Sequence, residues 1–311
     1  MSAGGGTKAI LAALGANAGI AVAKFVGFAV TGSASMLAEA VHSVADTSNQ
    51  GLLLLGQKTS QRRATPEHPF GFGRDRYFYS FIVALMLFTL GSAFALYEGI
   101  HKVQHPEPLN APIVAVIILV VAIGLESYSF RTAIVESRKI KGDLTWWGFI
   151  RQSRTPELPV VLLEDAGALL GLVFALFGVG LAVITDDPVW DGVGTLMIGV
   201  LLGVIAIILI VEMKSLLIGE GATPKELTSI EGVVVGGRVQ RLIHIRTQYL
   251  GPDELLVAAK IALESGLPLS EVAAEIDSAE QRIRAAVPAA RLIYLEPDLD
   301  RTPATSPPPR D

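Results

Sequence analysis

The stretch LAEAVHSVAD, Leu37 to Asp46, places Glu39, His42 and Asp46 inside a long apolar region. His42 and Asp46 are four residues apart, so on a helix they lie on one face, one turn apart. Imidazole and carboxylate together suit Zn²⁺, and less selectively Mn²⁺, Fe²⁺ or Co²⁺. The pair could bind a divalent metal, or the two side chains could hydrogen-bond only to each other or to a neighbouring helix.

A second apolar stretch, VVLLEDAGALLG, carries Glu164 and Asp165. An aspartate at the centre of a bilayer costs about 2.5–3.5 kcal/mol on insertion scales, so it is a functional candidate by default. Adjacent helical residues point about 100° apart. We therefore expect one acid to complete a metal site with the first pair, and the other to titrate or to face a cytoplasmic opening. Alternatively, the apolar span begins after Asp165 and both acids lie among lipid headgroups.

Other polar residues in apolar segments are weaker candidates. Asn17 could supply a carbonyl oxygen to a metal, although such an asparagine more often makes interhelical hydrogen bonds, and Asn49 has the same ambiguity. Glu39 lies close enough to a helix boundary to be interfacial. Lys24 can snorkel or pair with an acid, and Glu126 is expected to be a helix-end charge or an interhelical partner.

The composition indicates a membrane protein. The chain has 311 residues, of which 51% are hydrophobic and 18% charged, and its mean hydropathy is +0.50. Soluble domains carry about a quarter charged residues. Six segments approach the roughly 20 apolar residues that a transmembrane helix needs: Ala9–Val30, Ser33–Gly56, Tyr77–Ile100, Ala111–Phe130, Leu158–Ile184 and Val189–Val211.

The loops between these segments predict an orientation. Lysine and arginine are concentrated between spans two and three and between spans four and five, whereas the loop between spans five and six has two aspartates and no basic residue. Basic loops stay on the cytoplasmic side, so both termini are expected in the cytoplasm. The basic inner loops could also gate the protein or bind lipid, but we expect their main role to be setting this topology. We expect no cleavable signal peptide.

Charge and cysteine content exclude other classes. The net charge of −5 gives no reason to expect a nucleic-acid partner, and the absence of cysteine excludes disulfides and thiolate metal sites. The Ala-, Gly- and Arg-rich composition would suit a bacterial inner (plasma) membrane.

After about residue 219 the pattern changes to that of a small α+β domain. A helix beginning at Thr223-Pro224 is followed by two strands joined by a Gly-Pro-Asp turn, an amphipathic helix with Ser270 as its expected N-cap, and a last short strand. The predicted organisation is an N-terminal tail (1–8), a membrane domain (9–218), a cytoplasmic domain (219–299) and a Pro-rich disordered tail (300–311).

At these residues the sequence resembles the cation diffusion facilitator family of the zinc-transporter type. The matching pieces are the segment NAGIAVAKFVGFAVTGSASMLAEAVHSVADTSNQ, the segment HPFGFGRDRYFYSFIVAL, the acid-bearing fifth span, and RTQYLGPDELLVAAKIAL and LIYLEPDL in the cytoplasmic domain. The Glu-Asp pair and the Trp-bearing loop DLTWWGFIRQSRTPELP are similar to the subgroup that includes the mitochondrial zinc transporter. The resemblance runs from about Thr7 to Pro297.

The resemblance implies a fold and an activity. Family members are six-span homodimers with a ferredoxin-like cytoplasmic domain, and they export zinc or a similar divalent cation in exchange for protons; they are not enzymes and need no cofactor. The resemblance implies that His42 and Asp46 are metal ligands. Because protons and metal compete for neutral imidazole and ionised carboxylate, we expect the same two residues to carry the coupled protons. It favours Asp165 over Glu164 as the third ligand, with Glu164, Asn17 or water in the fourth position, and a stronger effect of Asp165→Asn than of Glu164→Gln.

Two departures from the family pattern qualify these expectations. Most members have His or Asp four residues before the fifth-span aspartate, and this chain has Val161 there, which leaves the metal preference open among zinc, manganese, iron and cobalt. Several members bind zinc in the cytoplasmic domain through histidines, and here His244 is that domain's single histidine while Tyr294 occupies a position where histidine is common. We therefore expect this domain to dimerise and to bind no metal tightly.

Other classes remain as alternatives. A metal-gated channel would line its pore with rings of weak ligands. An intramembrane hydrolase would keep a metal-bound water beside a general base, for which Glu164 is a candidate, but no His-Glu-x-x-His helix is present. A sensor could use the same ligands without any flux.

Overall fold

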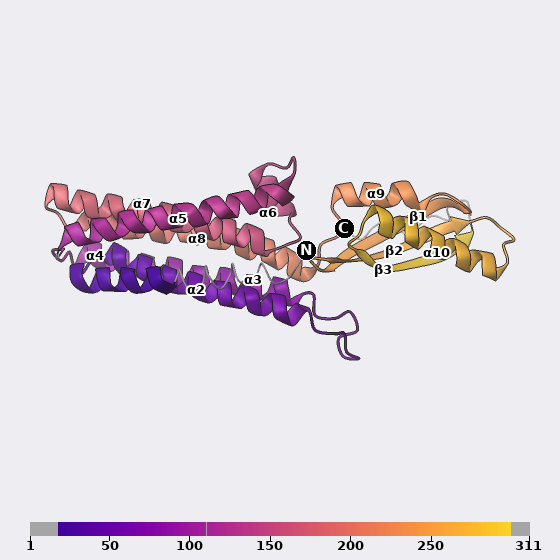
Figure 1. The fold of residues 1–311 in the computed structure, drawn as a ribbon, viewed down its shortest axis with the longest axis horizontal. Coiled ribbons are helices and arrows are strands. Elements are labelled where there is room, and N and C mark those ends of the chain that lie inside the picture. Colours follow the sequence, from indigo (N-terminus) through magenta and orange to yellow (C-terminus); the bar gives the residue numbers. More distant parts are fainter. Residues whose placement is uncertain (1–17, 110, 300–311) are drawn as a thin grey trace. The chain divides into compact units, whose positions relative to one another are not determined.

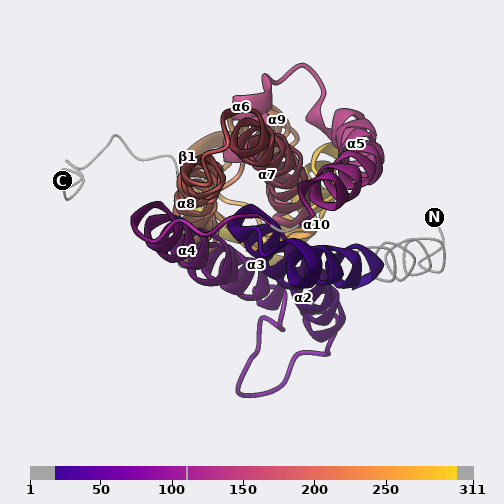
Figure 2. The ribbon, with the colours of Figure 1, turned by 90° about the vertical axis from the view of Figure 1, so that its left-hand side faces the viewer.

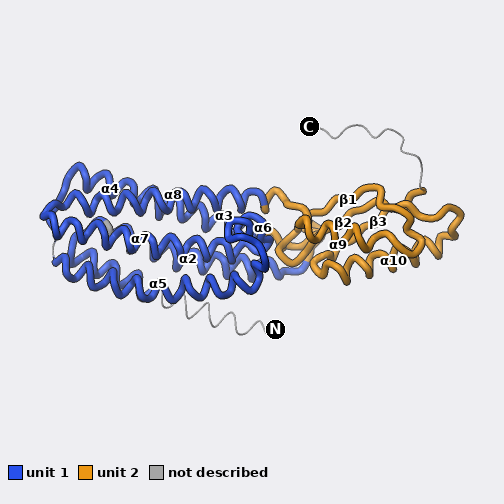
Figure 3. Tube along the Cα trace, turned by 90° about the horizontal axis from the view of Figure 1, so that it is seen from above, with its two compact units in different colours: residues 1–63, 75–215 blue, residues 64–74, 216–311 orange. Residues whose placement is uncertain are grey.

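The structure is a computed structural model that describes residues 18–109 and 111–299. The chain divides into two compact units, one of residues 1–63 and 75–215 and the other of residues 64–74 and 216–311 (Figure 3). The first unit is helical and the second is mixed α/β (Figure 1). Asn17, predicted as a candidate oxygen donor, and both predicted tails lie outside the described residues.

The helices of the first unit fall where the six apolar segments predict them. They are the helix Ala18–Thr31, α2 (Ala34–Ser60), α3 (Asp75–Met86) with η1 (Leu87–Ala93) and α4 (Phe94–Gln104), α5 (Pro112–Lys141), the short α6 (Trp146–Gln152), α7 (Glu157–Thr185) and α8 (Val189–Ile218).

Length and composition support the membrane assignment. Within the described residues, four helices are long and apolar enough to cross a membrane: Asp75–Gln104, α5, α7 and α8. The helix Ala18–Thr31 is apolar but shorter in its described part. The 27-residue α2 is long enough to span but less apolar, because it carries the ionisable residues singled out above.

Helix packing brings α2 and α7 together. α2 contacts α3, η1 and α7, and α7 also contacts α5. In the end-on view α5 and α8 flank α7 (Figure 2). Close approach of α7 and α8 depends on small residues, because a Cβ at Gly178 would lie 2.8 Å from the carbonyl oxygen of Trp190. This is the packing mode expected where helices associate in lipid.

The span that contains α3 and α4 is interrupted by a π-helical turn. Residues Leu87–Ala93 form η1, continuous with the α-helices on both sides. Ser92 in this turn donates a 2.7 Å hydrogen bond to the carbonyl oxygen of Gly199 on α8. A π-turn inside an α-helix is uncommon and is frequently found at functional sites.

The second unit has the predicted element order. It consists of α9 (Pro224–Val234), β1 (Val239–Gly251), β2 (Glu254–Leu263), α10 (Leu269–Ala286) and β3 (Ala290–Leu299). The sheet order is β1-β2-β3, with β1 antiparallel and β3 parallel to β2. Alternate residues of β2, from Leu255 to Leu263, join Ile230 of α9 and Ile283 of α10 in one core, so both helices cover the same face of the sheet.

Helix caps confirm one prediction and correct another. Thr223 forms a capping box with Glu226 at the start of α9, with Pro224 at the first position. The N-cap of α10 is Pro268, with no side-chain cap, and not Ser270, because the helix begins at Leu269. Pro268 has extended backbone angles that suit an N-cap, and its fixed φ ends the preceding loop.

The α2–α3 loop is part of the second unit. Residues 64–74, which include the HPFGFGR segment, cluster with residues 216–311. A Cβ at Gly73 would lie 2.7 Å from the carbonyl oxygen of Leu250 and 3.1 Å from the Cα of Gly251. The loop backbone therefore lies directly against the β1–β2 turn, and glycine at position 73 is what permits this approach.

Candidate metal centre

His42 and Asp46 lie on one face of α2, as their spacing predicts. Their closest atoms, Nδ1 and Oδ1, are 3.5 Å apart, which is too long for a good hydrogen bond. His42 has no exposed surface and Asp46 is 6% exposed. The structure therefore does not support the alternative in which His42 and Asp46 only hydrogen-bond to each other.

Glu164 on α7 faces this pair. The amide nitrogen of Asn49, one turn beyond Asp46 on α2, donates a 2.7 Å hydrogen bond to Glu164 Oε1. The carboxyl groups of Asp46 and Glu164 also interact directly. An acid of the fifth span thus lies against the ionisable face of α2, within a buried cluster.

Asp165 points to a different helix. The hydroxyl of Ser129 on α5 donates a 3.0 Å hydrogen bond to Asp165 Oδ2. Both acids lie well inside α7, which begins at Glu157, and they are only 5% and 9% exposed. This burial within the helical bundle argues against the alternative in which both acids lie exposed among lipid headgroups.

The nitrogen and carboxylate oxygen atoms of this cluster are of the types that bind a divalent cation, but their side chains do not surround a common point in this structure. Considering only residues the structure describes, no three His, Asp or Glu side chains are close enough together to hold a metal ion. Both ring nitrogens of His42 and Oδ1 of Asp46 are nonetheless buried without a hydrogen-bond partner in that part of the chain. Buried polar atoms in this state need water, a proton or an ion, so these are the atoms available to a metal ion.

Glu39 and Lys24 form a buried ion pair. Lys24 Nζ donates to Glu39 Oε2 at 3.1 Å and to Ser43 Oγ at 2.7 Å, and both charged side chains are fully buried. Glu39 is therefore packed inside the helical bundle and paired with a cation. Of the two expectations for Lys24, pairing with an acid is confirmed. Glu126 on α5 is also buried, at 6% exposure.

The π-turn lies beside His42. A Cβ at Gly91 in η1 would be 3.9 Å from His42 Nδ1. The sequence contains no signal for this turn, because a π-turn needs no special residue and the apolar periodicity continues across it. Its position next to a candidate ligand makes η1 a further element of the site.

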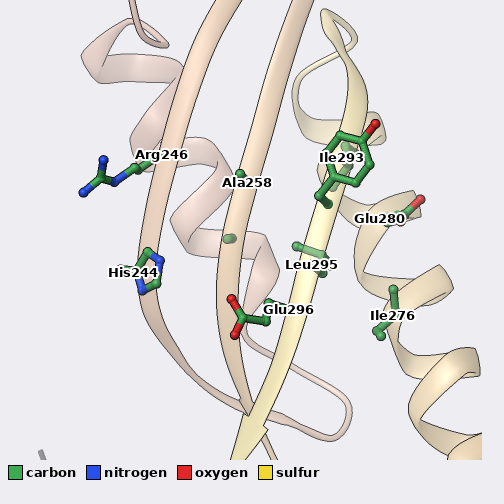
Figure 4. Close-up of a pocket in the computed structure, with 10 residues that line it drawn as sticks. His244, Arg246, Ala258, Ile276, Glu280, Ile293, Leu295 and Glu296 are labelled. Carbon is green, nitrogen blue, oxygen red and sulfur yellow. The ribbon is translucent and has the colours of Figure 1, made fainter. Parts of the chain in front are cut away.

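The second unit offers a second candidate site at His244. His244 on β1 and Glu296 on β3 line a shallow pocket on the sheet (Figure 4). Lys260 on β2 lies between them in the strand register, and its amine contacts Glu296 at 3.0 Å and Asp298 at 3.1 Å. Hydrogen bonds to Glu296 and Asp298 raise the pKa of Lys260. A lysine side chain already neutralises the carboxylates that a metal would need.

These observations define a helical membrane protein with a buried carboxylate–imidazole cluster between two of its spans. Residues 10–218 match the family model described as the cation efflux transmembrane domain. The chain therefore belongs to the cation efflux family, the cation diffusion facilitators.

Named relatives refine this assignment. The chain is 36% identical over 242 residues to the mouse protein called proton-coupled zinc antiporter SLC30A9, mitochondrial, covering 76% of this chain and 42% of that protein. It is 28% identical to metal tolerance protein C4 of Arabidopsis thaliana, over 82% of this chain and 56% of the relative. It is 26% identical to the cation-efflux pump FieF of Cronobacter sakazakii, over 92% and 91%. The chain thus spans about half the length of its more similar curated relatives.

Proposed function

We propose that this protein exports a divalent metal cation, most simply Zn²⁺, across a membrane in exchange for protons. The observation that carries the proposal is the convergence of Asp46 on α2 and Glu164 on α7, beside a His42 whose two ring nitrogens have no partner in the described structure. The relatives named as a proton-coupled zinc antiporter and as cation-efflux pumps support it.

We assign the site to His42, Asp46, Glu164 and Asp165. Glu164 is the fifth-span acid that faces α2 here, and Asp165 is held by Ser129. Asn17, within the predicted first span Ala9–Val30, is a further oxygen donor in the proposal. Nitrogen and carboxylate oxygen together favour zinc, while a site rich in oxygen also accepts manganese, iron or cobalt.

Coupling follows from competition for the same atoms. A metal binds neutral imidazole and ionised carboxylate, so protons and metal exclude each other at His42 and Asp46. Metal loads where proton activity is low, and protons replace it on the other side. Movement of α2 relative to α7 would expose the site to one side at a time, as in other secondary transporters.

The experiment is metal-driven proton flux in proteoliposomes, run separately with zinc, manganese, iron and cobalt. The wild type should move protons against at least zinc, and Asp46→Ala should abolish both fluxes while the protein remains folded. A matched control is Glu136→Gln, an exposed acid of α5. Wild-type transport by Asp46→Ala, or channel-like conductance without proton exchange, would contradict the proposal.

The membrane and the orientation belong to the same proposal. The basic loops support a cytoplasmic location of both termini, and we propose a bacterial plasma membrane. The relatives named as mitochondrial make a mitochondrial membrane the alternative. Reaction of single engineered cysteines, placed in a chain that has none, tests the orientation.

We also propose a homodimer formed through the cytoplasmic unit, which binds no metal tightly. The helices of this unit cover one face of its sheet, and the opposite face, with Arg246, Ala258 and Tyr294 in register, is open. The full-length protein in detergent should have the mass of a dimer. The full-length Asp46→Ala variant should bind no zinc stoichiometrically below micromolar concentration, and such binding would place a metal site in the cytoplasmic unit.

A further inference from the structure

The Lys24–Glu39 ion pair is not explained by packing. Neither side chain has exposed surface, and the pair joins the helix Ala18–Thr31 to α2 inside the helical bundle. Desolvation of two charges generally offsets their attraction, and apolar residues of similar shape usually stabilise such a position at least as well. An ionisable pair within a transmembrane bundle is therefore a candidate for function.

Glu39 is the first member of a file of buried polar residues along α2. Glu39, His42, Asp46 and Asn49 are separated by three, four and three residues, so they share one face of the helix. Each has a buried atom that lacks a hydrogen-bond partner among residues 18–109 and 111–299: Glu39 Oε1, His42 Nδ1 and Nε2, Asp46 Oδ1 and Asn49 Oδ1. Among the described residues, buried polar atoms without a hydrogen-bond partner thus extend one turn from His42 toward the start of α2.

The file follows the interface between α2 and α7 at two levels. At the first level, Asp46 and Asn49 meet Glu164. At the second, the free Oε1 of Glu39 faces Gly171, where a Cβ would lie only 2.6 Å from it. Positions 39 and 46 are seven apart, and so are positions 164 and 171, so the two levels lie about 10 Å apart along antiparallel helices. The glycine leaves space for the Glu39 carboxylate between α2 and α7.

A cation already occupies the second level. The Lys24 ammonium bonds one oxygen of Glu39 and the hydroxyl of Ser43, while the other Glu39 oxygen has no hydrogen bond in the described part of the chain. An ammonium and a metal ion cannot share one carboxylate without strong repulsion at this burial. Occupancy of Glu39 by Lys24 and by a metal should therefore be mutually exclusive.

We propose that Glu39 is a second carboxylate station on the path of the divalent cation, and that the Lys24 side chain is its built-in occupant when no metal is there. This inference rests on the proposed transport function. A metal that leaves His42 and Asp46 binds Glu39 and displaces the Lys24 ammonium from it. The ammonium then keeps its hydrogen bond to Ser43. The returning ammonium then expels the metal on the side away from the basic loops.

The test uses the full-length protein in proteoliposomes and in detergent, with zinc as the probe. Glu39→Gln should lower zinc turnover at least tenfold, while zinc affinity at equilibrium changes less than threefold, because the first-level ligands are intact. Lys24→Met should slow zinc release, seen as a lower turnover together with tighter zinc retention. The double variant Lys24→Met/Glu39→Gln should regain the melting temperature of the wild type but not its turnover.

The double variant separates function from structure. If the pair only ties two helices together, removing both charges restores turnover along with stability, and that result overturns the inference. The matched control is Arg76→Gln/Glu157→Gln, which removes an interhelical ion pair that lies off the file; it should keep zinc turnover within about twofold of the wild type. If wild-type vesicles transport none of the four metals, the proposed function itself has failed, and the inference falls with it.

Discussion

Asn49 and Glu164 are joined by a 2.7 Å hydrogen bond across the α2–α7 interface, 115 positions apart in the chain. The bond corresponds to one rotation of α7 about its axis, in which Glu164 faces α2. Because adjacent helical residues point about 100° apart, Asp165 then faces elsewhere. Asp165 indeed bonds Ser129 on α5. The two adjacent acids therefore have different partners, and their roles can be separated by mutation.

We expect Glu164→Gln to weaken zinc binding more than Asp165→Asn, by about 100-fold against about tenfold. The reason is that Glu164 lies in the same buried cluster as Asp46, whereas Asp165 bonds Ser129 on α5 and would act only as a supporting group. Supporting groups of metal ligands typically change metal affinity by about 10–100-fold. This order is opposite to the one that the family resemblance favours. Equilibrium zinc titration of both full-length variants decides, and a larger loss for Asp165→Asn would return the ligand role to that residue.

The metal preference should depend on His42. Replacing its nitrogen donor by an oxygen donor, in His42→Asp, makes the cluster all-carboxylate, which suits harder cations such as Mn²⁺ better than zinc. We expect zinc transport to fall about tenfold or more while the ratio of manganese to zinc transport rises. Competition between the two metals in proteoliposomes measures this ratio. An unchanged ratio would show that the imidazole is not a ligand.

Much of the architecture follows from local patterns. Apolar length predicts the helices of the membrane unit, and Thr223-Pro224 predicts the start of α9, because both signals are contained in a few neighbouring residues. The spacing of His42 and Asp46 likewise predicts their shared face.

The parts that could not be predicted depend on contacts between distant segments. Adjacent positions such as Glu164 and Asp165 differ by about 100° in direction, and only the packing of α7 decides which one faces α2. The burial of Glu39 depends on Lys24 being level with it on another helix. The π-turn at Leu87–Ala93 leaves no mark in the apolar pattern.

The loop that joins α2 to α3 should be sensitive at Gly73. In Gly73→Ala the new methyl group would meet the backbone at Leu250 and Gly251, which cannot yield as a side chain would. We expect the contact to open, at a cost of about 1–3 kcal/mol, with faster hydrogen exchange of the amides around the β1–β2 turn. The control is Gly232→Ala in α9, where nothing lies within 4 Å of the added atom. Unchanged exchange in Gly73→Ala would show that the loop does not pack on this turn in solution.

Asp191 on α8 should anchor the start of α2 without touching the metal. Its carboxylate is fully buried and accepts hydrogen bonds from Ser33 Oγ at 2.8 Å and from the backbone amide of Ala34 at 2.7 Å. A carboxylate at a helix N-terminus also interacts favourably with the helix dipole. Asp191→Ala leaves buried donors unpaired, so we expect a loss of about 1–3 kcal/mol, or a fall in melting temperature of about 2–4 °C for each kcal/mol.

Two comparison variants sharpen this test. Asp191→Asn keeps one acceptor oxygen and should lose less stability than Asp191→Ala. Asp187→Ala removes an exposed acid whose contact is with the backbone amide of Val189 at the start of α8, and should cost about 1 kcal/mol as a lost cap. Zinc affinity should stay within threefold of wild type in all three, because Asp191 acts on the position of α2 and not on the cation. A variant at Asp191 with the wild-type melting temperature and greatly weakened zinc binding would instead make this residue part of the metal path.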